Sequence, residues 1–417
     1  MTSLNAVIIV IKLVISLVVQ RILAVSLGET GIAKIGQLRN LTHIITSTSS
    51  LGTFNGLVKY VSEYREQKSK LNELFSTAFV FGFVGAILTS LVILFYAIWI
   101  TNKLFGNLEF LFLIKILALL PPIIGLNRIF QGLINGLSDY KKFAKIELIS
   151  YLLSTVLLLI FLYKFQLKGV LFSIIITPLI QLGIIIYIFG SIIKKYLQIK
   201  FLNFKISFAK ELLGYTLMAI VSSILLNYVE LDIRTTISNK INVNEAGYWT
   251  AMTFISKNYL VFSSSLFALY VIPRFSRINE GHVFRKEVFI IYKIWLPLFG
   301  SGMILVYILR NTIINIIYPN FTGLEPLFKW QLLGDFVLLA SLVVSHQFLA
   351  KKMVKSYVLT ELISLALFYF LAKYLVVKYG TEGAVMAHFF RYVFYFVMVV
   401  LVVNNYFKIQ KKKEVNE

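Results

Sequence analysis

Long runs of apolar residues without a charged side chain recur along this chain, and they constrain its fold more than any other feature. The run Phe79–Ile100 contains no Asp, Glu, Lys or Arg, and the run Leu152–Tyr163 is equally apolar. An α-helix of about 20 apolar residues spans the ~30 Å hydrocarbon core of a bilayer. Because a spanning helix satisfies its backbone hydrogen bonds internally, these runs predict an all-α integral membrane protein.

The composition agrees with lipid as the main solvent. Hydrophobic residues make up 58% of the 417 residues and charged residues only 14%, whereas a soluble domain has about 25% charged residues. The pattern predicts twelve membrane spans separated by turn-forming segments. These spans lie near residues 4–26, 37–58, 74–100, 110–135, 146–163, 169–192, 212–237, 246–272, 287–309, 329–349, 356–377 and 383–407.

The distribution of basic residues predicts the orientation of the chain. If the N-terminus lies in the cytoplasm, the cytoplasmic segments carry 23 Lys and Arg residues and the opposite loops carry 7. This asymmetry follows the positive-inside rule, so both termini are expected in the cytoplasm. The net charge of +22 is therefore explained by membrane topology, and no nucleic-acid partner is expected.

The tetrapeptide Glu-Leu-Ile-Ser occurs twice, at Glu147 and at Glu361, which are 214 residues apart. Gly169 and Gly383 have the same separation, and each pair has equivalent places in the predicted spans. The offset predicts an internal repeat of two six-helix halves, and both halves start on the cytoplasmic side. For each glutamate the alternative is a carboxylate that only starts a helix or reaches the membrane surface.

The repeat predicts two lobes. We expect an N-terminal lobe over residues 1–193, a basic amphipathic linker on the cytoplasmic surface over 194–210, and a C-terminal lobe over 211–417. Two parallel lobes with polar residues between them are typical of transporters that expose a central cavity to each side in turn. Within the N-terminal lobe, the GxxxG pairs Gly52–Gly56 and Gly132–Gly136 predict close helix packing.

Ionisable residues inside the predicted spans are the strongest candidates for a functional site. A charge at the centre of a membrane helix costs about 2.5–3.5 kcal/mol on insertion scales, so such residues face protein or water. Basic residues outnumber acidic ones within the spans, which favours an anionic substrate, and arginine offers a bidentate fork for phosphate. The candidate substrate-binding residues are Arg21, Arg39, Lys59, Arg128, Arg234 and Lys257. The candidate coupling or gating residues are Asp335, Glu361, Glu147 and Asp232.

Some of these charges have alternative explanations. Lys59 lies at the inner end of its span, where a topology-determining charge is equally expected. Asp335 is a lone acid in the apolar run WQLLGDFVLLA, which favours either cation coupling or an internal ion pair.

Several kinds of chemistry are excluded. The chain has no cysteine, so disulfides, thiolate metal sites and cysteine nucleophiles are absent. Its four histidines show no metal-ligand spacing, and the sequence contains no Gly-Lys pair, so a Walker A loop for ATP is missing. We therefore expect no catalytic residues and no cofactor, with coupling to H⁺ or Na⁺ left open.

The chain resembles one known family in several segments that follow the family's order. These segments are LAVSLGETGIAKIGQLRNL, GTFNGLVKYVSEY, EAGYWTAMTFISKNYL, FKWQLLGDF and LTELISLAL. The family is the bacterial Wzx-type flippases for lipid-linked oligosaccharides, and the most similar subgroup is the translocases for O-antigen and enterobacterial common antigen. The resemblance implies the V-shaped fold of the multidrug/oligosaccharidyl-lipid/polysaccharide exporter superfamily, with twelve spans in two lobes.

The resemblance also implies roles for individual residues. The positions that match charged residues of the family are Arg21, Lys59, Arg234, Asp335 and Glu361. One position departs from the family, whose members often read ISDxYL where this sequence has Lys257. An acid replaced by a base weakens a coupling role at this position and makes the expected cavity more basic.

The cargo implied by the resemblance is undecaprenyl diphosphate carrying a short oligosaccharide, moved from the cytoplasmic to the periplasmic leaflet of the bacterial inner membrane. Candidate partners are this lipid, other membrane lipids, and the polymerase and chain-length proteins of polysaccharide assembly. Two alternatives stay open. A cation-coupled multidrug exporter shares the fold but favours an acidic cavity. A membrane polysaccharide polymerase needs a large periplasmic loop, and the predicted spans leave room for none.

Overall fold

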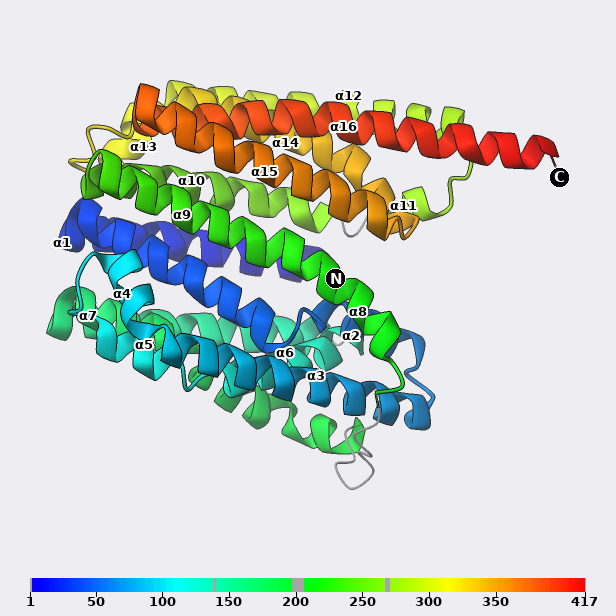
Figure 1. The fold of residues 1–417 in the computed structure, drawn as a ribbon, viewed down its shortest axis with the longest axis horizontal. Helices are drawn as coiled ribbons and strands as arrows, with labels where there is room; N and C mark the ends of the chain where they lie inside the picture. The colour runs from blue at the N-terminus through cyan, green and yellow to red at the C-terminus, as the bar shows by residue number, and fades with distance from the viewer. Residues whose placement is uncertain (1, 138–139, 197–205, 267–270, 417) are drawn as a thin grey trace. The chain divides into compact units, whose positions relative to one another are not determined.

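The computed structural model describes residues 2–137, 140–196, 206–266 and 271–416. Within these ranges the chain forms helices joined by turns and contains no strand (Figure 1). The prediction of an all-α chain is therefore confirmed. Most of the predicted linker over 194–210 lies outside the described residues.

The helices follow one another in chain order. Those of the first half are α1 (Thr2–Ser49), α2 (Phe54–Glu63), α3 (Lys68–Phe95), α4 (Ala97–Phe105), α5 (Leu111–Leu117), α6 (Pro121–Gly136) and α7 (Tyr140–Tyr196). Then come α8 (Ala209–Ala219), a π-helical segment (Ile220–Leu225), α9 (Leu226–Lys240), α10 (Val243–Leu266), α11 (Ile272–Ser276), α12 (Gly281–Ile308), α13 (Arg310–Ile317), α14 (Leu327–Ala350), α15 (Val354–Tyr379) and α16 (Thr381–Asn416).

Two helices are too long for a single membrane crossing. α1 has 48 residues and α7 has 57, and at about 1.5 Å per residue each exceeds twice the ~30 Å hydrocarbon core. Each contains one residue with non-helical torsion angles, Gly28 in α1 (φ 61°, ψ −168°) and Gln166 in α7 (φ 51°, ψ −136°). The chain thus turns where the sequence predicts the loops after the first and fifth spans.

The 214-residue offset recurs in the backbone torsion angles. Gln166 precedes Gly380 by this distance, and Gly380 has nearly the same angles (φ 62°, ψ −149°). Gly106 (φ 75°) precedes Asn320 (φ 80°) by the same number of residues. Left-handed backbone is rare outside glycine, so two matched positions indicate that equivalent turns of the two halves have the same geometry.

The helix contacts beside these turns repeat as well. A Cβ added to Gly169 would lie 2.2 Å from the carbonyl oxygen of Phe161. A Cβ on Gly383 would lie 2.2 Å from the carbonyl oxygen of Leu375. Both glycines therefore allow consecutive helices to pack backbone against backbone at the same step of the repeat.

The helices include many that can cross a bilayer. Eight of the described helices are long and apolar enough, and the bent pair α5–α6, with 46° between its parts, makes a ninth. The eighth predicted span corresponds to α10, a more polar helix that is not among them. A multi-pass membrane protein is confirmed, while the count of twelve crossings and the cytoplasmic position of both termini stay predictions.

By packing, the described chain divides into two compact units. Unit 1 comprises residues 1–27 and 34–231, and unit 2 comprises residues 28–33 and 232–417. The lobe boundaries expected from the sequence stay a prediction.

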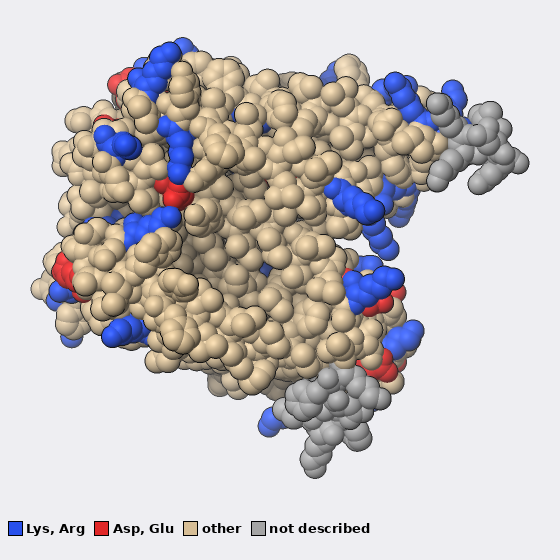
Figure 2. All heavy atoms as spheres, viewed as in Figure 1, with Lys and Arg blue, Asp and Glu red and all other residues tan. Residues whose placement is uncertain are grey.

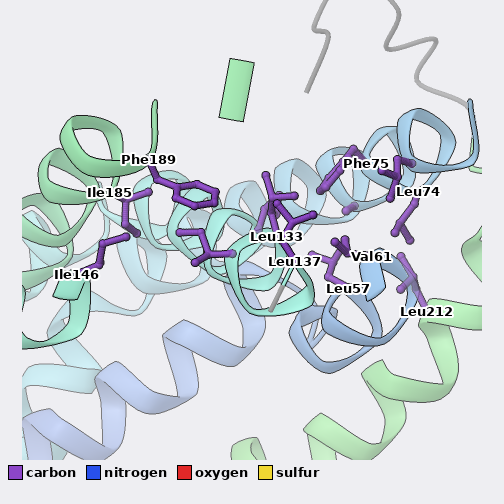
Figure 3. Close-up of a cluster of buried hydrophobic side chains, with 14 residues drawn as sticks. Leu57, Val61, Leu74, Phe75, Leu133, Leu137, Ile146, Ile185, Phe189 and Leu212 are labelled. Carbon is purple, nitrogen blue, oxygen red and sulfur yellow. The ribbon is translucent and has the colours of Figure 1, made fainter. Parts of the chain in front are cut away.

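Unit 1 has a tightly packed interior around α2. Buried side chains of α2, α3, α6, α7 and α8 form one cluster there (Figure 3). A Cβ on Gly136 would lie 2.5 Å from the Cβ of Val61, and one on Gly56 would lie 2.7 Å from a methyl group of Leu212. Both GxxxG pairs therefore serve close packing, as predicted, because each brings a neighbouring helix against α2.

The surface is apolar along the middle of the helices. On the face shown in Figure 2, Lys and Arg side chains lie mainly near helix ends. Large hydrophobic residues such as Phe83, Leu298 and Val377 are more than 60% exposed. Exposed apolar side chains in this number indicate contact with lipid.

Candidate functional site

A group of charged and polar side chains lies inside unit 1, on α1 and α7. Lys12 Nζ on α1 lies 3.1 Å from Glu147 Oε2 on α7. Gln181 Nε2 donates a hydrogen bond of 3.2 Å to Glu147 Oε1, and the Tyr151 hydroxyl donates one of 3.3 Å to the carbonyl oxygen of Lys12. Glu147, in the predicted fifth span, is thus held by side chains of the predicted first and sixth spans.

Two predicted substrate-binding arginines belong to the same group. The Arg128 guanidinium on α6 lies 3.9 Å from the centre of the Phe54 ring, and its Nη1 donates to Gln131 Oε1 at 3.2 Å. Arg128 interacts electrostatically with Glu147, and Arg39 interacts electrostatically with Tyr151. We call these residues the basic cluster: Lys12, Arg39, Arg128, Glu147, Tyr151 and Gln181.

The basic cluster has an excess of positive charge in an apolar surrounding. Lys12 and Arg128 both interact with the Glu147 carboxylate, and the side chains of Lys12 and Glu147 are 28% and 31% exposed. Arg128 Nε is buried and makes no hydrogen bond within the described part of the chain. An unsatisfied N–H donor beside excess positive charge favours an anionic ligand that accepts hydrogen bonds, such as a phosphate.

A second polar group surrounds Asp335 in unit 2. The carboxylate, which is fully buried, accepts hydrogen bonds from Ser256 Oγ at 2.6 Å and from the Tyr259 hydroxyl. Gln331 Nε2 lies 3.2 Å from it, and His388 Nε2 lies 2.8 Å from its Oδ1. Asp335 therefore joins α10, α14 and α16, and its partner is an ionisable histidine.

The other two acidic candidates of unit 2 pair with basic residues of nearby spans. Asp232 Oδ2 lies 2.8 Å from Lys373 Nζ on α15. Glu361 lies 3.7 Å from Arg391 Nη2 on α16, and Arg391 Nε also donates to Ser364 Oγ at 3.0 Å. These pairs neutralise two of the basic residues that lie inside predicted spans.

The repeat extends to the partners of the two Glu-Leu-Ile-Ser glutamates. Gln181, which binds Glu147, follows it by 34 residues, and Tyr395, which forms a side-chain hydrogen bond with Glu361, also follows it by 34 residues. Each glutamate thus bonds to a side chain at the same place in the next span of its half.

The remaining candidates lie in different surroundings. Arg234 is buried, its Nε donates to Thr250 Oγ1 at 2.7 Å, and its guanidinium lies 5.0 Å from the Trp249 ring centre. Lys59 lies over the Tyr60 ring. Arg21 and Lys257 are exposed on α1 and α10. Of the ten candidates, Arg128 and Glu147 interact with each other, and Arg39 interacts with Tyr151 of the same group.

No group of three or more metal-binding side chains occurs among the described residues.

Comparison with known proteins decides the family. Residues 38–321, more than half of the chain, match the family model described as polysaccharide biosynthesis protein. The chain belongs to this family. It is 28% identical over 392 residues to the protein named lipid III flippase of Escherichia coli strain K12, with 93% of each chain covered, and equally similar to the protein of that name from Shigella flexneri.

Solved structures show the same fold. An inward-facing multidrug-resistance transporter of the MATE family and MOP superfamily matches with a TM-score of 0.77 at 13% identity, covering 96% of each chain. The lipid II flippase MurJ, in an inward closed conformation, matches with a TM-score of 0.68 at 19% identity, covering 96% of this chain and 87% of MurJ. The exporter-superfamily fold is confirmed, and the family member described here is a multi-pass inner-membrane protein.

Sequence reasoning missed several members of these groups. Lys12 is one of two basic residues in the predicted first span, which marks it as an intramembrane charge but does not show its partner. His388 shows no metal spacing, yet it contacts Asp335 from another helix. Gln331 and Asp335 are four residues apart and so share one helix face; this spacing could have identified Gln331.

Proposed function

We propose that this protein is a flippase that moves an oligosaccharide linked to undecaprenyl diphosphate from the cytoplasmic to the periplasmic leaflet. The observation that carries the proposal is the basic cluster, in which Lys12 and Arg128 both interact with the Glu147 carboxylate and Arg39 interacts with the neighbouring Tyr151. The similarity to lipid III flippases over 93% of the chain supports this class of cargo.

The basic cluster supplies the chemistry that a diphosphate needs. Arg128 offers a planar fork of donors, and its stacking on Phe54 fixes the orientation of that fork. Lys12 is held by Glu147 at 3.1 Å, and an entering phosphate competes with that carboxylate for the ammonium group. Binding and release of the diphosphate are thereby linked to the breaking and remaking of one ion pair.

The sugar part of the cargo explains why a protein is needed. Each hydroxyl without a hydrogen-bond partner costs several kcal/mol in hydrocarbon, roughly 4–8 kcal/mol on the cyclohexane scale. A polar path through the protein removes this cost, while the polyprenyl tail stays in the bilayer.

Two energy sources are compatible with this mechanism. With the cytoplasm negative, moving one negative charge outward releases about 2.3 kcal/mol per 100 mV. The second source is coupling to H⁺ or Na⁺, for which the buried Asp335 with its partner His388 is the candidate site. Polymerase and chain-length proteins are proposed partners that receive the flipped cargo.

The alternative function is export of cationic drugs, since the MATE transporters share the fold. The charge of the basic cluster argues against a cationic cargo, because three cations repel it and one carboxylate attracts it. The relatives are flippases and transporters, not enzymes.

Transport by the purified, full-length protein in proteoliposomes tests the proposal. The vesicles contain a fluorescent undecaprenyl-diphosphate oligosaccharide, and a membrane-impermeant reagent reports the fraction of sugar on the outer leaflet. We expect sugar exchange well above that of protein-free vesicles. Exchange at the protein-free rate, together with uptake of a cationic dye, would instead establish the drug exporter.

A further inference from the structure

A cavity of about 740 Å³ lies in unit 2, far along the chain from the basic cluster. It is formed by the first turn of α12 and the C-terminal part of α16. The side chains that define its chemistry are Arg285 on α12 and Leu401, Asn404, Asn405, Lys408 and Lys411 on α16. Figure 2 shows Lys and Arg side chains over this end of α16.

The walls of this cavity are strongly basic. Arg285, Lys408 and Lys411 are basic, and Glu280 is the single acid among the described lining residues. Glu280 faces His282, with its Oε2 3.1 Å from Nδ1. The lining thus has three basic side chains and one carboxylate, and this excess of positive charge attracts anions.

The two helices meet closely at the base of the cavity. A Cβ on Gly281, the first residue of α12, would lie 3.0 Å from the Cβ of Phe407. No side chain caps the first turn of α12, and its free N–H groups add to the positive potential there. The cavity is therefore a depression between two packed helices and not a gap in the fold.

The length of α16 places the cavity at the edge of the bilayer. Leu401 follows the first residue of α16, Thr381, by 20 residues, a rise of about 30 Å, equal to the hydrocarbon thickness. Leu401 is 63% exposed and marks the apolar side of the cavity. Lys408 and Lys411 lie about two to three turns further along the helix, where lipid headgroups are found.

We propose that this cavity binds the phosphate headgroup of an anionic glycerophospholipid of the surrounding membrane. Arg285, Lys408 and Lys411 contact the phosphate, the Asn404 and Asn405 amides hydrogen-bond headgroup oxygens, and one acyl chain lies along Leu401. Basic depressions between membrane helices at the cytoplasmic surface suit such headgroups. The bound lipid holds the start of α12 against the end of α16.

Native mass spectrometry of the purified full-length protein with phosphatidylglycerol tests this inference. The variant Lys408→Gln/Lys411→Gln removes two charges from the cavity. The matched control Lys352→Gln/Lys355→Gln removes two charges from exposed positions of unit 2 on the same predicted side of the membrane. Each basic residue near an anionic headgroup contributes about a fivefold gain in affinity.

We expect the cavity variant to bind the first phosphatidylglycerol at least tenfold more weakly than the wild type, with the control unchanged. The affinity for zwitterionic phosphatidylcholine should be the same for the wild type, the cavity variant and the control. Equal affinity of the cavity variant and the control for phosphatidylglycerol would overturn the inference. The inference would also be overturned if the cavity variant lost affinity for undecaprenyl diphosphate and not for phosphatidylglycerol, because the cavity would then bind the cargo. Neither outcome depends on whether the protein flips its cargo.

Discussion

The substitution Arg128→Gln tests the basic cluster most sharply. It removes the guanidinium that lies 3.9 Å from the Phe54 ring centre and whose buried Nε lacks a partner within the described residues. Glutamine keeps an N–H donor on a shorter side chain but loses the charge and the planar fork. Glu147 keeps its ion pair with Lys12 at 3.1 Å, so no unpaired carboxylate is left and the variant should fold as well as the wild type.

The expected loss follows from the strength of the bonds removed. A hydrogen bond to a charged group contributes about 1.5–3 kcal/mol. Losing this contribution in the rate-limiting complex slows transport roughly 10- to 150-fold. Arg128→Lys keeps the charge and loses the fork, so we expect an intermediate rate for it.

The proteoliposome assay with the fluorescent lipid-linked sugar measures this rate. The control is Arg310→Gln, which removes an equal charge from the other unit, where Arg310 pairs with the exposed Glu325 at 2.9 Å. Thermal unfolding in detergent verifies that both variants are folded. Wild-type transport by the folded Arg128→Gln variant would refute a role of Arg128 in cargo binding.

Four further substitutions and one control test packing, backbone geometry and coupling. Gly136→Ala should lower the free energy of unfolding by about 1–3 kcal/mol, because the new Cβ would lie 2.5 Å from a side chain of α2. The control Gly183→Ala, whose new Cβ would meet no atom within 4 Å, should not lower it. Equal thermal stability of the two variants would contradict the close packing at Gly136. Gln166→Gly should stabilise the protein by about 1 kcal/mol and Gly380→Gln should destabilise it by about 1–3 kcal/mol, since both positions have left-handed backbone. If denaturant unfolding showed Gln166→Gly to be destabilising or Gly380→Gln to be stabilising, the two turns would not be equivalent. Asp335→Asn should remove any response of transport to an imposed H⁺ or Na⁺ gradient while transport driven by membrane potential continues; an unchanged gradient response would exclude Asp335 as the coupling site.

Periodicity and local sequence were enough to predict the helices, and the offset that predicts the repeat has counterparts in the structure. Apolar runs identify spanning helices because lipid leaves the backbone few alternatives. The turns near Gly28 and Gln166 fall between predicted spans, and the 214-residue offset of Glu147 and Glu361 reappears in the torsion angles at Gln166 and Gly380.

The partners of the charged residues could not be predicted in this way. Lys12 and Glu147 are 135 residues apart, and Asp335 and His388 are 53 apart; such pairs depend on how helices pack, and a single sequence carries little information on that. Arg234 is a candidate because it lies in a predicted span. Its burial beside Thr250 depends on the contact between α9 and α10, which the sequence does not show.

The affinity of the purified protein for its cargo tests the central claim most directly. The wild type should bind an undecaprenyl-diphosphate oligosaccharide at least about tenfold more tightly than the same lipid and sugar joined by an uncharged linker. The variant Lys12→Gln/Arg39→Gln/Arg128→Gln should bind the two ligands equally. If this triple variant still preferred the diphosphate as strongly as the wild type, the basic cluster would not be the site that holds the cargo.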